Sequence, residues 1–285
     1  MIIAENFDLS QYNSYKISAV CKRAFFPNTE EDINSIYFQY PDSKKIIIGS
    51  GHNIILSKEY YDEDFIIFSD CFNDVKINET NIKALSGIDL LTLSELALEN
   101  ELSGLEIFYD IPSSLGGAVV MNAGANGEDI KDLLVETRYF DPNEATFHSI
   151  AKEDINFEYR NSFFQKNPHL IITEVSLQLK RGNKDDILGK MQTIKNQRWA
   201  KQPRDFPNAG SVFKRPEGYF VGAIMDELGL KGFSIGGAKI SEKHGGFIVN
   251  HDQATGQDIL AVIEHVQSMV KEKYGFELEV EQRVI

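Results

Sequence analysis

The stretch that decides how this sequence is interpreted is Ile111-Pro112-Ser113-Ser114-Leu115-Gly116-Gly117-Ala118, followed by Asn122-Ala123-Gly124-Ala125-Asn126-Gly127. Two closely spaced glycine-rich turns predict one extended ligand, because short side chains let the backbone approach a diphosphate and a flat ring. Ser113, Ser114 and Asn122 add hydrogen-bonding groups. The alternative is a tightly packed crossing of loops that binds nothing.

A further turn of small residues, Gly49-Ser50-Gly51-His52-Asn53, lies earlier in the chain and follows the apolar run Ile46-Ile47-Ile48. A Rossmann fingerprint needs a third glycine at position 54, where this chain has isoleucine, so that motif is absent. The backbone amides of such a turn still suit an anion. A plain connection between strands is the alternative.

The segments around these turns mix helical and strand patterns. We expect helices from Thr29, over 89–99, over 184–199 and over 256–274, the last ended by Gly275. We expect strands at 46–48, 65–68, 135–140, 170–179 and 276–281. Because strands and helices do not alternate regularly, the pattern predicts an α+β fold in two parts.

Composition places the chain among globular proteins. It has 285 residues, of which 42% are hydrophobic and 25% charged. No apolar run is long enough to cross a membrane and the first residues lack the pattern of a signal peptide, so we expect a cytoplasmic protein without membrane partners. Cys21 and Cys71 read as reduced thiols. The six histidines form no short-spaced pair, so no metal site is expected.

The charge of the chain is uneven. The net charge of −14 disfavours binding to nucleic acid. Residues 195–215, called the basic segment below, nevertheless hold six basic residues against the single acid Asp205. This segment is either a solvated loop or a docking site for a small phosphorylated or carboxylated ligand.

Three further patterns are candidates for chemistry: Tyr159-Arg160-Asn161-Ser162, the run from Asn208 to Lys214, and the acids Glu277, Glu279 and Glu281. On a strand the three acids would share one face, because side chains repeat every second residue. Each pattern alone also has a plain structural interpretation, as a helix cap, a turn or a solvated face.

Taken together, these segments resemble the UDP-N-acetylenolpyruvoylglucosamine reductases (UDP-N-acetylmuramate dehydrogenases) of bacterial cell-wall synthesis over nearly the whole chain. The family's remaining segments occur in the family's order: Asn13-Ser14-Tyr15-Lys16-Ile17, Gly104-Leu105-Glu106, Gln202-Pro203, Gly236-Gly237-Ala238-Lys239, Lys243-His244, Ile248-Val249-Asn250 and Leu278-Glu279-Val280-Glu281. The compact stretch from Ser211 to Glu281 is similar to the family's shorter type, which lacks a substrate-covering loop insertion.

The resemblance implies an FAD-binding fold of the PCMH/vanillyl-alcohol-oxidase type, made of two α+β subdomains over residues 1–185, and a C-terminal α+β substrate-binding domain over 186–285. It implies a cytoplasmic, monomeric enzyme that contains FAD and uses NADPH as co-substrate. The implied reaction reduces UDP-N-acetylglucosamine enolpyruvate to UDP-N-acetylmuramate for peptidoglycan, and so serves cell shape and division. Another flavoprotein oxidase or dehydrogenase of the same fold, with flavin attached at His52, is the alternative.

The resemblance also assigns roles to residues. It implies catalytic roles for Arg160, Ser211 and Glu281. It implies that FAD is bound by Gly49, Ser50, Gly51, His52, Asn53, Ile54, Pro112, Ser113, Ser114, Gly116, Gly117, Asn122, Gly124, Ala125 and Gly127. It implies that substrate is bound by Tyr159, Arg160, Asn208, Gly210, Lys214 and Arg215.

Three of these residues depart from the family pattern. Ser113 replaces a usual glycine, His52 a small hydroxyl residue, and Arg215 a frequent asparagine.

The residue types suit the implied chemistry. Hydride addition to the β-carbon of an enolpyruvyl ether leaves negative charge at the α-carbon and its carboxylate, which a guanidinium such as that of Arg160 stabilises. The hydroxyl of Ser211 can then supply a proton to the α-carbon, because the enolate is strongly basic. Glu281 would bind the enolic form or orient the proton donor.

Overall fold

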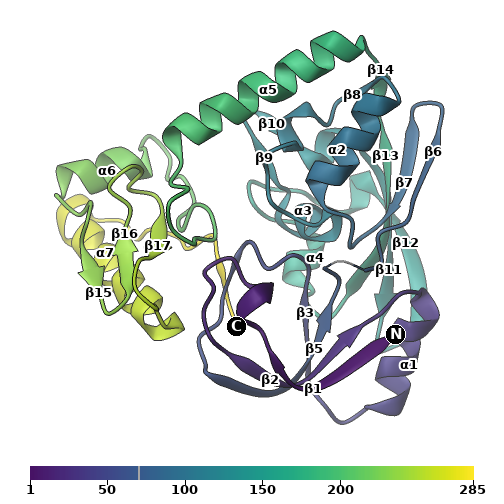
Figure 1. Ribbon diagram of the computed structural model, residues 1–285, viewed down its shortest axis with the longest axis horizontal. Coiled ribbons are helices and arrows are strands. Elements are labelled where there is room, and N and C mark those ends of the chain that lie inside the picture. The colour runs from purple at the N-terminus through teal and green to yellow at the C-terminus, as the bar shows by residue number, and fades with distance from the viewer. Residues whose placement is uncertain (70) are drawn as a thin grey trace. The chain divides into compact units, whose positions relative to one another are not determined.

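The computed structural model describes residues 1–69 and 71–285, and it divides the chain into two compact units (Figure 1). The first unit contains Met1–Glu5, Arg23–Ser50 and Glu63–Gln197, and the second contains Asn6–Lys22, Gly51–Asp62 and Arg198–Ile285. Each unit thus combines segments that are distant in sequence, where the sequence analysis expected one boundary after residue 185. Both units mix helices and strands, which confirms the α+β prediction.

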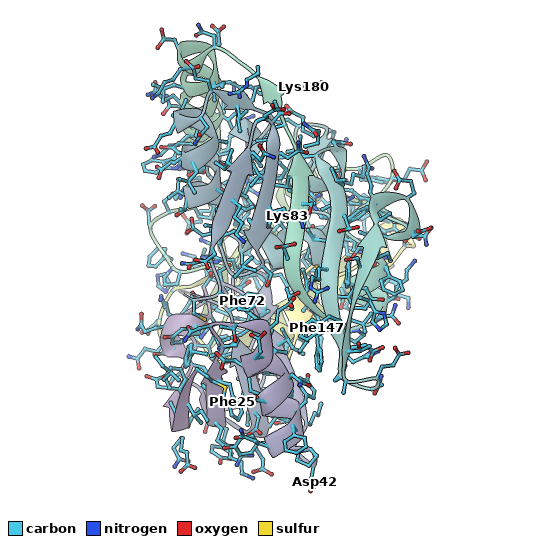
Figure 2. The ribbon with its side chains drawn as sticks, turned by 90° about the vertical axis from the view of Figure 1, so that its right-hand side faces the viewer. Phe25, Asp42, Phe72, Lys83, Phe147 and Lys180 are labelled. Carbon is cyan, nitrogen blue, oxygen red and sulfur yellow. The ribbon has the colours of Figure 1, made fainter. Side chains whose placement is uncertain are left out.

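The larger sheet of the first unit has five antiparallel strands in the order β12-β11-β13-β7-β6. Their bounds are β6 Val75–Asn78, β7 Asn81–Leu85, β11 Leu134–Asp141, β12 Thr146–Ala151 and β13 Ile171–Gln178. Strand β13 buries Val175 and Leu177, whereas Glu174 pairs with Lys83 at 3.0 Å on the opposite face. Figure 2 views that outer face and labels Lys83.

Two helices pack on the inner face of this sheet: α2 (Leu90–Glu99) and α3 (Leu115–Met121). Helix α2 contributes Leu90, Leu93 and Ala97 to a core that includes Ile82 and Val175 of the sheet. These three positions recur at the helical spacing that the sequence predicted, and Asp89 caps the first turn by accepting the N–H of Thr92. The sheet and α2 thereby fix where α3 begins.

The smaller sheet has the strand order β1-β2-β5-β3, with β3 parallel to β5. The bounds are β1 Ile2–Asp8, β2 Val20–Phe26, β3 Lys45–Ile48 and β5 Tyr60–Ile67, and the residues of β1, β2 and β5 are divided between the two units. Helix α1 (Glu30–Gln39) buries Ile33 and Ile36 in a core with Phe25 and Ile66. This helix begins after Thr29, as predicted, and Thr29 and Asp32 form a capping box at its start.

The remaining elements of the first unit are short, except for one long helix. They are β8 Leu102–Ser103, β9 Gly124–Ala125, β10 Glu128–Asp129, β14 Lys180–Arg181, α4 Phe163–Lys166, and the 3-10 turns Glu106–Phe108, Ile130–Asp132 and Lys152–Asp154. Helix α5 (Lys184–Lys201) is long, and its last residues belong to the second unit. Within the described residues, no helix combines the length and the apolar character that crossing a membrane requires.

The second unit is built around a three-stranded antiparallel sheet in the order β15-β16-β17, against which α7 packs. The bounds are α6 Val221–Glu227, β15 Ser234–Ile235, β16 Ala238–Ile240, β17 Ile248–Asn250 and α7 Gly256–Tyr274, with a 3-10 turn at Ser10–Tyr12. A parallel pair joins β4 (Ile54–Ile55) to β18 (Arg283–Val284). The last residues of the chain therefore lie beside the segment that follows Gly51.

The predicted terminal strand over 276–281 is wrong. This segment makes one isolated bridge, Val280 with Phe213, and regular strand structure begins only at Arg283. Its backbone instead bonds to the loop before it: the N–H of Lys214 donates to the carbonyl of Glu279, and that of Glu281 to the carbonyl of Val212. The segment alternates apolar and acidic residues, and this alternation predicted a strand. In the described part of the chain its backbone pairs with one short loop, so no ladder forms.

Two other expectations need correction. Gly116 and Gly117 do not form a turn, because both lie in the first turn of α3, whose N-cap is Ser114. The helix predicted over 184–199 extends to Lys201 as α5, and near its end the side chain of Trp199 is 48% exposed. Only Ile187, Met191 and Ile194 of α5 are buried, so the apolar stripe ends before the last turn.

Helix α7 generates a stability prediction. Gly275 ends this helix in the left-handed conformation with φ 77°, where a side chain is strained. We expect Gly275→Ala to lower the free energy of unfolding by about 1 kcal/mol. The control is Gly222→Ala in α6 of the same unit, where the added Cβ meets open space and φ is ordinary. Thermal unfolding of both variants measures the effect, and equal midpoints would contradict it.

Candidate active site

The turn at Gly49 and the loop before α3, which the resemblance assigns to the same cofactor, approach each other within the first unit. The N–H of Ser114 donates to Oγ of Ser50 at 2.9 Å. A Cβ on Gly49 would lie 2.1 Å from Oγ of Ser114, so a larger residue would displace the hydroxyl that caps α3. The structure therefore brings Gly49 and Ser50 together with the loop before α3.

The loop before α3 is held by the backbone of the segment before α2. Leu90 N–H donates to the carbonyl of Ser113 at 2.9 Å, and Leu115 N–H donates to the carbonyl of Ile88 at 2.8 Å. Pro112 is exposed, Ser113 and Gly117 are half-buried, and the side chain of Ser114 accepts the N–H of Gly117. The loop is thus rigidly placed while part of its surface stays accessible.

The turn that begins at Gly49 continues into Gly51–Ile54, which belongs to the second unit. The end of the chain holds this continuation in place. Arg283 N–H donates to the carbonyl of Asn53 at 3.0 Å, and Nδ2 of Asn53 donates to the carbonyl of Glu281 at 3.3 Å. Ile54 is buried in strand β4. This arrangement brings Asn53 next to Glu281, two of the residues assigned to the site from sequence.

His52 has an unusual environment in this turn. Its Nδ1 atom is buried and has no hydrogen-bond partner in the described part of the chain. Burial, with a smaller contribution from the charge of Lys16, lowers the pKa of His52 to about 4. The imidazole is therefore neutral at pH 7 and offers a buried nitrogen that a ligand can satisfy.

The second glycine-rich stretch is organised by Arg160. This residue adopts a left-handed conformation with φ 52° in the tight turn between Glu158 and Asn161. Its guanidinium donates to the carbonyl oxygens of Asn122 at 3.0 Å and Gly124 at 2.5 Å. The guanidinium also contacts the carboxylate of Asp129 at 3.4 Å and lies over the ring of Tyr159 at 5.1 Å. The structure thus joins Arg160 to the loop after α3.

Two residues of this stretch serve the protein's own packing. Asn122 is fully buried, and its side chain donates to the carbonyl of Glu158 and accepts the N–H of Lys131. A Cβ on Gly124 would lie 2.2 Å from the carbonyl of Glu128 and from Oδ1 of Asp129. The glycine requirement at 124 is therefore set by the β9–β10 pairing. Ala125 is half-buried, and Gly127 is exposed with open space at its Cβ.

Ser211 lies in the second unit, on a loop that starts with an Asn-centred turn. Oδ1 of Asn208 accepts the N–H of Gly210, and Gly210 has φ 81°, a conformation that favours glycine. Val212 N–H then donates to the carbonyl of Gly246 at 2.9 Å. Ser211 itself is exposed, so its hydroxyl is presented to whatever this face of the loop binds.

Of the three acids predicted to share one face, Glu277 and Glu279 are exposed and Glu281 is half-buried. Glu279 pairs with Nζ of Lys214 at 2.5 Å. The N–H of Glu281 donates to the carbonyl of Val212 at 2.8 Å, next to Ser211 in the chain. The second unit thus brings the Ser211 loop and Glu281 together.

Within the basic segment, several charged side chains have protein partners, among them Arg204, Lys214 and Arg215. The guanidinium of Arg215 stacks over the ring of Phe220 at 3.9 Å and donates to the carbonyl of Tyr219 at 3.3 Å. Arg204 lies over the ring of Trp199 at 4.8 Å. Phe220 and Trp199 are both exposed, so each pair presents an aromatic ring and a positive charge to solvent. Tyr159, assigned to substrate binding, is 53% exposed in the first unit.

The groups that hold the Ser211 loop were not predicted from the sequence. Gln282 is 4% exposed, and its Nε2 donates to the carbonyl of Ala209 at 3.0 Å. The hydroxyl of Tyr15 donates to Oε1 of Gln282 at 2.9 Å. Tyr15 and Asn250 stand in quoted segments without an assigned role. A glutamine after three alternating acids gave no signal, because burial of a single side chain is invisible in the sequence.

His52 generates a prediction about pH. Its pKa is lowered in the folded protein, so the unfolded chain binds more protons below its ordinary pKa and stability falls as pH decreases. Between pH 7 and pH 5 we expect His52 to remove about 1–2 kcal/mol from the free energy of unfolding.

The measurement compares the wild-type protein with His52→Gln, which does not titrate, by denaturant unfolding at both pH values. His169→Gln is the matched control, because that histidine is exposed. If His52→Gln keeps the wild-type loss of stability, the neutral imidazole is refuted.

Comparison with known proteins identifies two family models along the chain. Residues 22–149 match a model described as an FAD binding domain, and residues 202–285 match the C-terminal domain of UDP-N-acetylenolpyruvoylglucosamine reductase. Among curated proteins, the chain is 39% identical to a UDP-N-acetylenolpyruvoylglucosamine reductase of Francisella tularensis, covering 99% of this chain and 100% of that protein. It is 40% identical to one of Thermotoga maritima, covering 97% and 96%.

A solved structure gives the same result. The UDP-N-acetylenolpyruvylglucosamine reductase of Thermus caldophilus superposes with a TM-score of 0.83 at 30% identity, covering 99% of this chain and 98% of that one. Similarity in sequence and fold thus extends over the full length. This chain belongs to the family of UDP-N-acetylenolpyruvoylglucosamine reductases and is an FAD-containing oxidoreductase.

Proposed function

We propose that this chain catalyses the NADPH-dependent reduction of UDP-N-acetylglucosamine enolpyruvate to UDP-N-acetylmuramate, a step of peptidoglycan precursor synthesis. The observation that carries the proposal is the similarity to reductases named for this substrate over 99% of the chain. The proposed enzyme is a cytoplasmic monomer. Residues 1–185 are proposed to bind FAD and residues 186–285 to bind substrate.

The residues of the two loops fit FAD. Gly49, Ser50 and Ser114 approach one another and carry no side chain larger than a hydroxymethyl group, which suits a diphosphate that lies close to the backbone. His52 supplies a buried nitrogen without a partner in residues 1–69 and 71–285. The cofactor is proposed to be held by Gly49–Ile54, Pro112–Ser114, Gly116, Gly117, Asn122, Gly124, Ala125 and Gly127. When bound, FAD supplies the hydride, which it receives from NADPH.

Arg160 is proposed to bind the carboxylate of the enolpyruvyl group. Its contacts to the carbonyls of Asn122 and Gly124 fix the plane of the guanidinium. A guanidinium carries five N–H donors and stays protonated at any working pH. Hydride addition at the β-carbon increases the negative charge on that carboxylate. A fixed cation stabilises this charge without reorganisation during the reaction, which lowers the barrier.

Ser211 is proposed to donate the proton that the α-carbon then receives. Its exposed hydroxyl lies on a loop whose backbone is fixed on both sides, at Gly210 and Val212. An alcohol is a weak acid, so it can act here only because the enolate is a strong base. Glu281, bonded through its backbone to Val212, is proposed to orient that hydroxyl or to bind the enolic oxygen.

The sugar-nucleotide is proposed to bind at Tyr159, Asn208, Gly210, Lys214 and Arg215. Arg215 is the exposed cation of this set, whereas Lys214 is already paired with Glu279 and only 14% exposed. An arginine stacked on an aromatic ring is held in place and still offers donors to an anion. We therefore assign the stronger contact with the diphosphate to Arg215.

The proposal predicts a separation of the two half-reactions in Ser211→Ala. Substrate-driven reoxidation of the flavin should slow by about 10²–10⁴-fold, because a proton donor of the transition state is lost. Reduction by NADPH should keep its rate, since the proton is needed only afterwards. Stopped-flow absorbance of the flavin measures each step.

Ser211→Cys is the matched variant, because a thiol also carries a proton, and it should recover part of the rate. If Ser211→Ala instead lost reduction by NADPH and kept reoxidation by substrate, the residue would belong to nicotinamide binding. The assignment as proton donor would then be wrong.

A second prediction concerns the basic segment. Arg215→Glu should raise KM for the sugar-nucleotide about tenfold, equivalent to about 1.4 kcal/mol, with a smaller change in kcat. The contact is expected to be equal before and during the reaction. Arg181→Glu, an exposed arginine of the first unit, makes the same change in net charge and serves as control. Equal KM values for the two variants would mean that Arg215 acts only through the overall electrostatic field of the protein and makes no direct contact with substrate.

A further inference from the structure

One buried side chain holds the loop that carries Ser211. Nε2 of Gln282 lies 3.0 Å from the carbonyl oxygen of Ala209, 3.2 Å from that of Gly210 and 3.4 Å from that of Ser211. A primary amide has two N–H donors, so they are shared among three successive carbonyl groups. The amide therefore fixes the direction of the backbone at the residue proposed to deliver the proton.

The amide of Gln282 is itself held by a buried phenol. The hydroxyl of Tyr15 donates to Oε1 of Gln282 at 2.9 Å, and both side chains are buried. This bond makes Oε1 the acceptor end of the amide. The donor end must then point to the loop, because a flipped amide would place its oxygen against three carbonyl oxygens. Burial raises the pKa of Tyr15, so the phenol remains a donor at all working pH values.

Tyr15 is in turn fixed by Asn250 at the end of strand β17. Nδ2 of Asn250 donates to the carbonyl of Tyr15 at 2.7 Å, and Oδ1 accepts the N–H of Ala254 at 2.8 Å. All these residues belong to the second unit. The result is a continuous hydrogen-bonded chain from the three-stranded sheet through Tyr15 and Gln282 to the Ser211 loop.

We propose that Gln282, oriented by Tyr15, is a positioning residue that sets Ser211 for proton transfer. The inference rests on the proposed role of Ser211 and extends it to two residues that touch no reacting atom. An apolar side chain of similar size could fill the same space, so packing alone does not require an amide here. What the amide adds is direction, and a misplacement of about 1 Å at a reacting group can cost about 100-fold in rate.

The test measures both half-reactions in Gln282→Leu, Ser211→Ala and the double variant. If Gln282 acts through Ser211, Gln282→Leu slows flavin reoxidation by substrate about 10- to 100-fold and leaves reduction by NADPH unchanged. In the Ser211→Ala background the same substitution has no further effect, because the group that it positions is gone. A general loss of structure would slow both steps and would add to the effect of Ser211→Ala.

Gln267→Leu is the matched control. Its Nε2 donates to the carbonyl of Leu278 at 2.7 Å, so it also supports the C-terminal segment through an amide, but at a carbonyl outside the Ser211 loop. It should leave reoxidation at the wild-type rate. A loss equal to that of Gln282→Leu would overturn the proposal, because any support of this segment would then suffice.

Tyr15→Phe keeps the ring and removes only the donor to Gln282, so it tests the same chain if Gln282→Leu does not fold. It should slow reoxidation in the same selective way, by a smaller factor. If Ser211→Ala slows reoxidation while Gln282→Leu and Tyr15→Phe do not, this inference fails and the role of Ser211 stands. If Ser211→Ala leaves reoxidation unchanged, both are overturned.

Discussion

The close approach of the loop after β3 to the loop before α3 is the constraint on which the first unit's part of the site depends. Gly49 has no side chain at the point where Oγ of Ser114 lies, and the N–H of Ser114 bonds to Oγ of Ser50. The sheet and α2 supply this approach, because backbone bonds from Ile88 and Leu90 fix the loop on its other side. A core of ordinary packing thereby brings together two turns that are some sixty residues apart.

The sequence predicted elements well where one side-chain pattern determines the structure. Thr29, Asp89 and Gly275 mark helix ends at the positions where caps are found, since each local group satisfies backbone atoms of its own helix. Prediction failed where the structure of a segment depends on the segment it pairs with. The residues from Phe276 to Glu281 alternate as a strand does, yet their neighbour is the short loop after Ala209, and no ladder forms.

The same distinction applies to the site. Runs of small residues predicted the loops around Gly49 and over residues 111–127, because the sequence shows directly where side chains are small or absent. The reason for a given glycine was not visible: Gly124 avoids Glu128 and Asp129 of its own hairpin, and Gly117 lies inside a helix. Nor did the sequence indicate that Asn122 is fully buried and that its side chain bonds to Glu158 and Lys131.

Both groups proposed to act on the enolpyruvyl moiety are positioned through main-chain carbonyl groups. Arg160 is held by the carbonyls of Asn122 and Gly124, and the Ser211 loop by the amide of Gln282. Every residue carries a carbonyl, so such contacts leave no trace in the residue types of the loops that accept them. The only sequence signal lies in the donor, and a buried arginine or glutamine must find acceptors wherever it is placed. The residues that position the proposed catalytic groups in this enzyme are therefore found by identifying the acceptor of each buried side-chain donor.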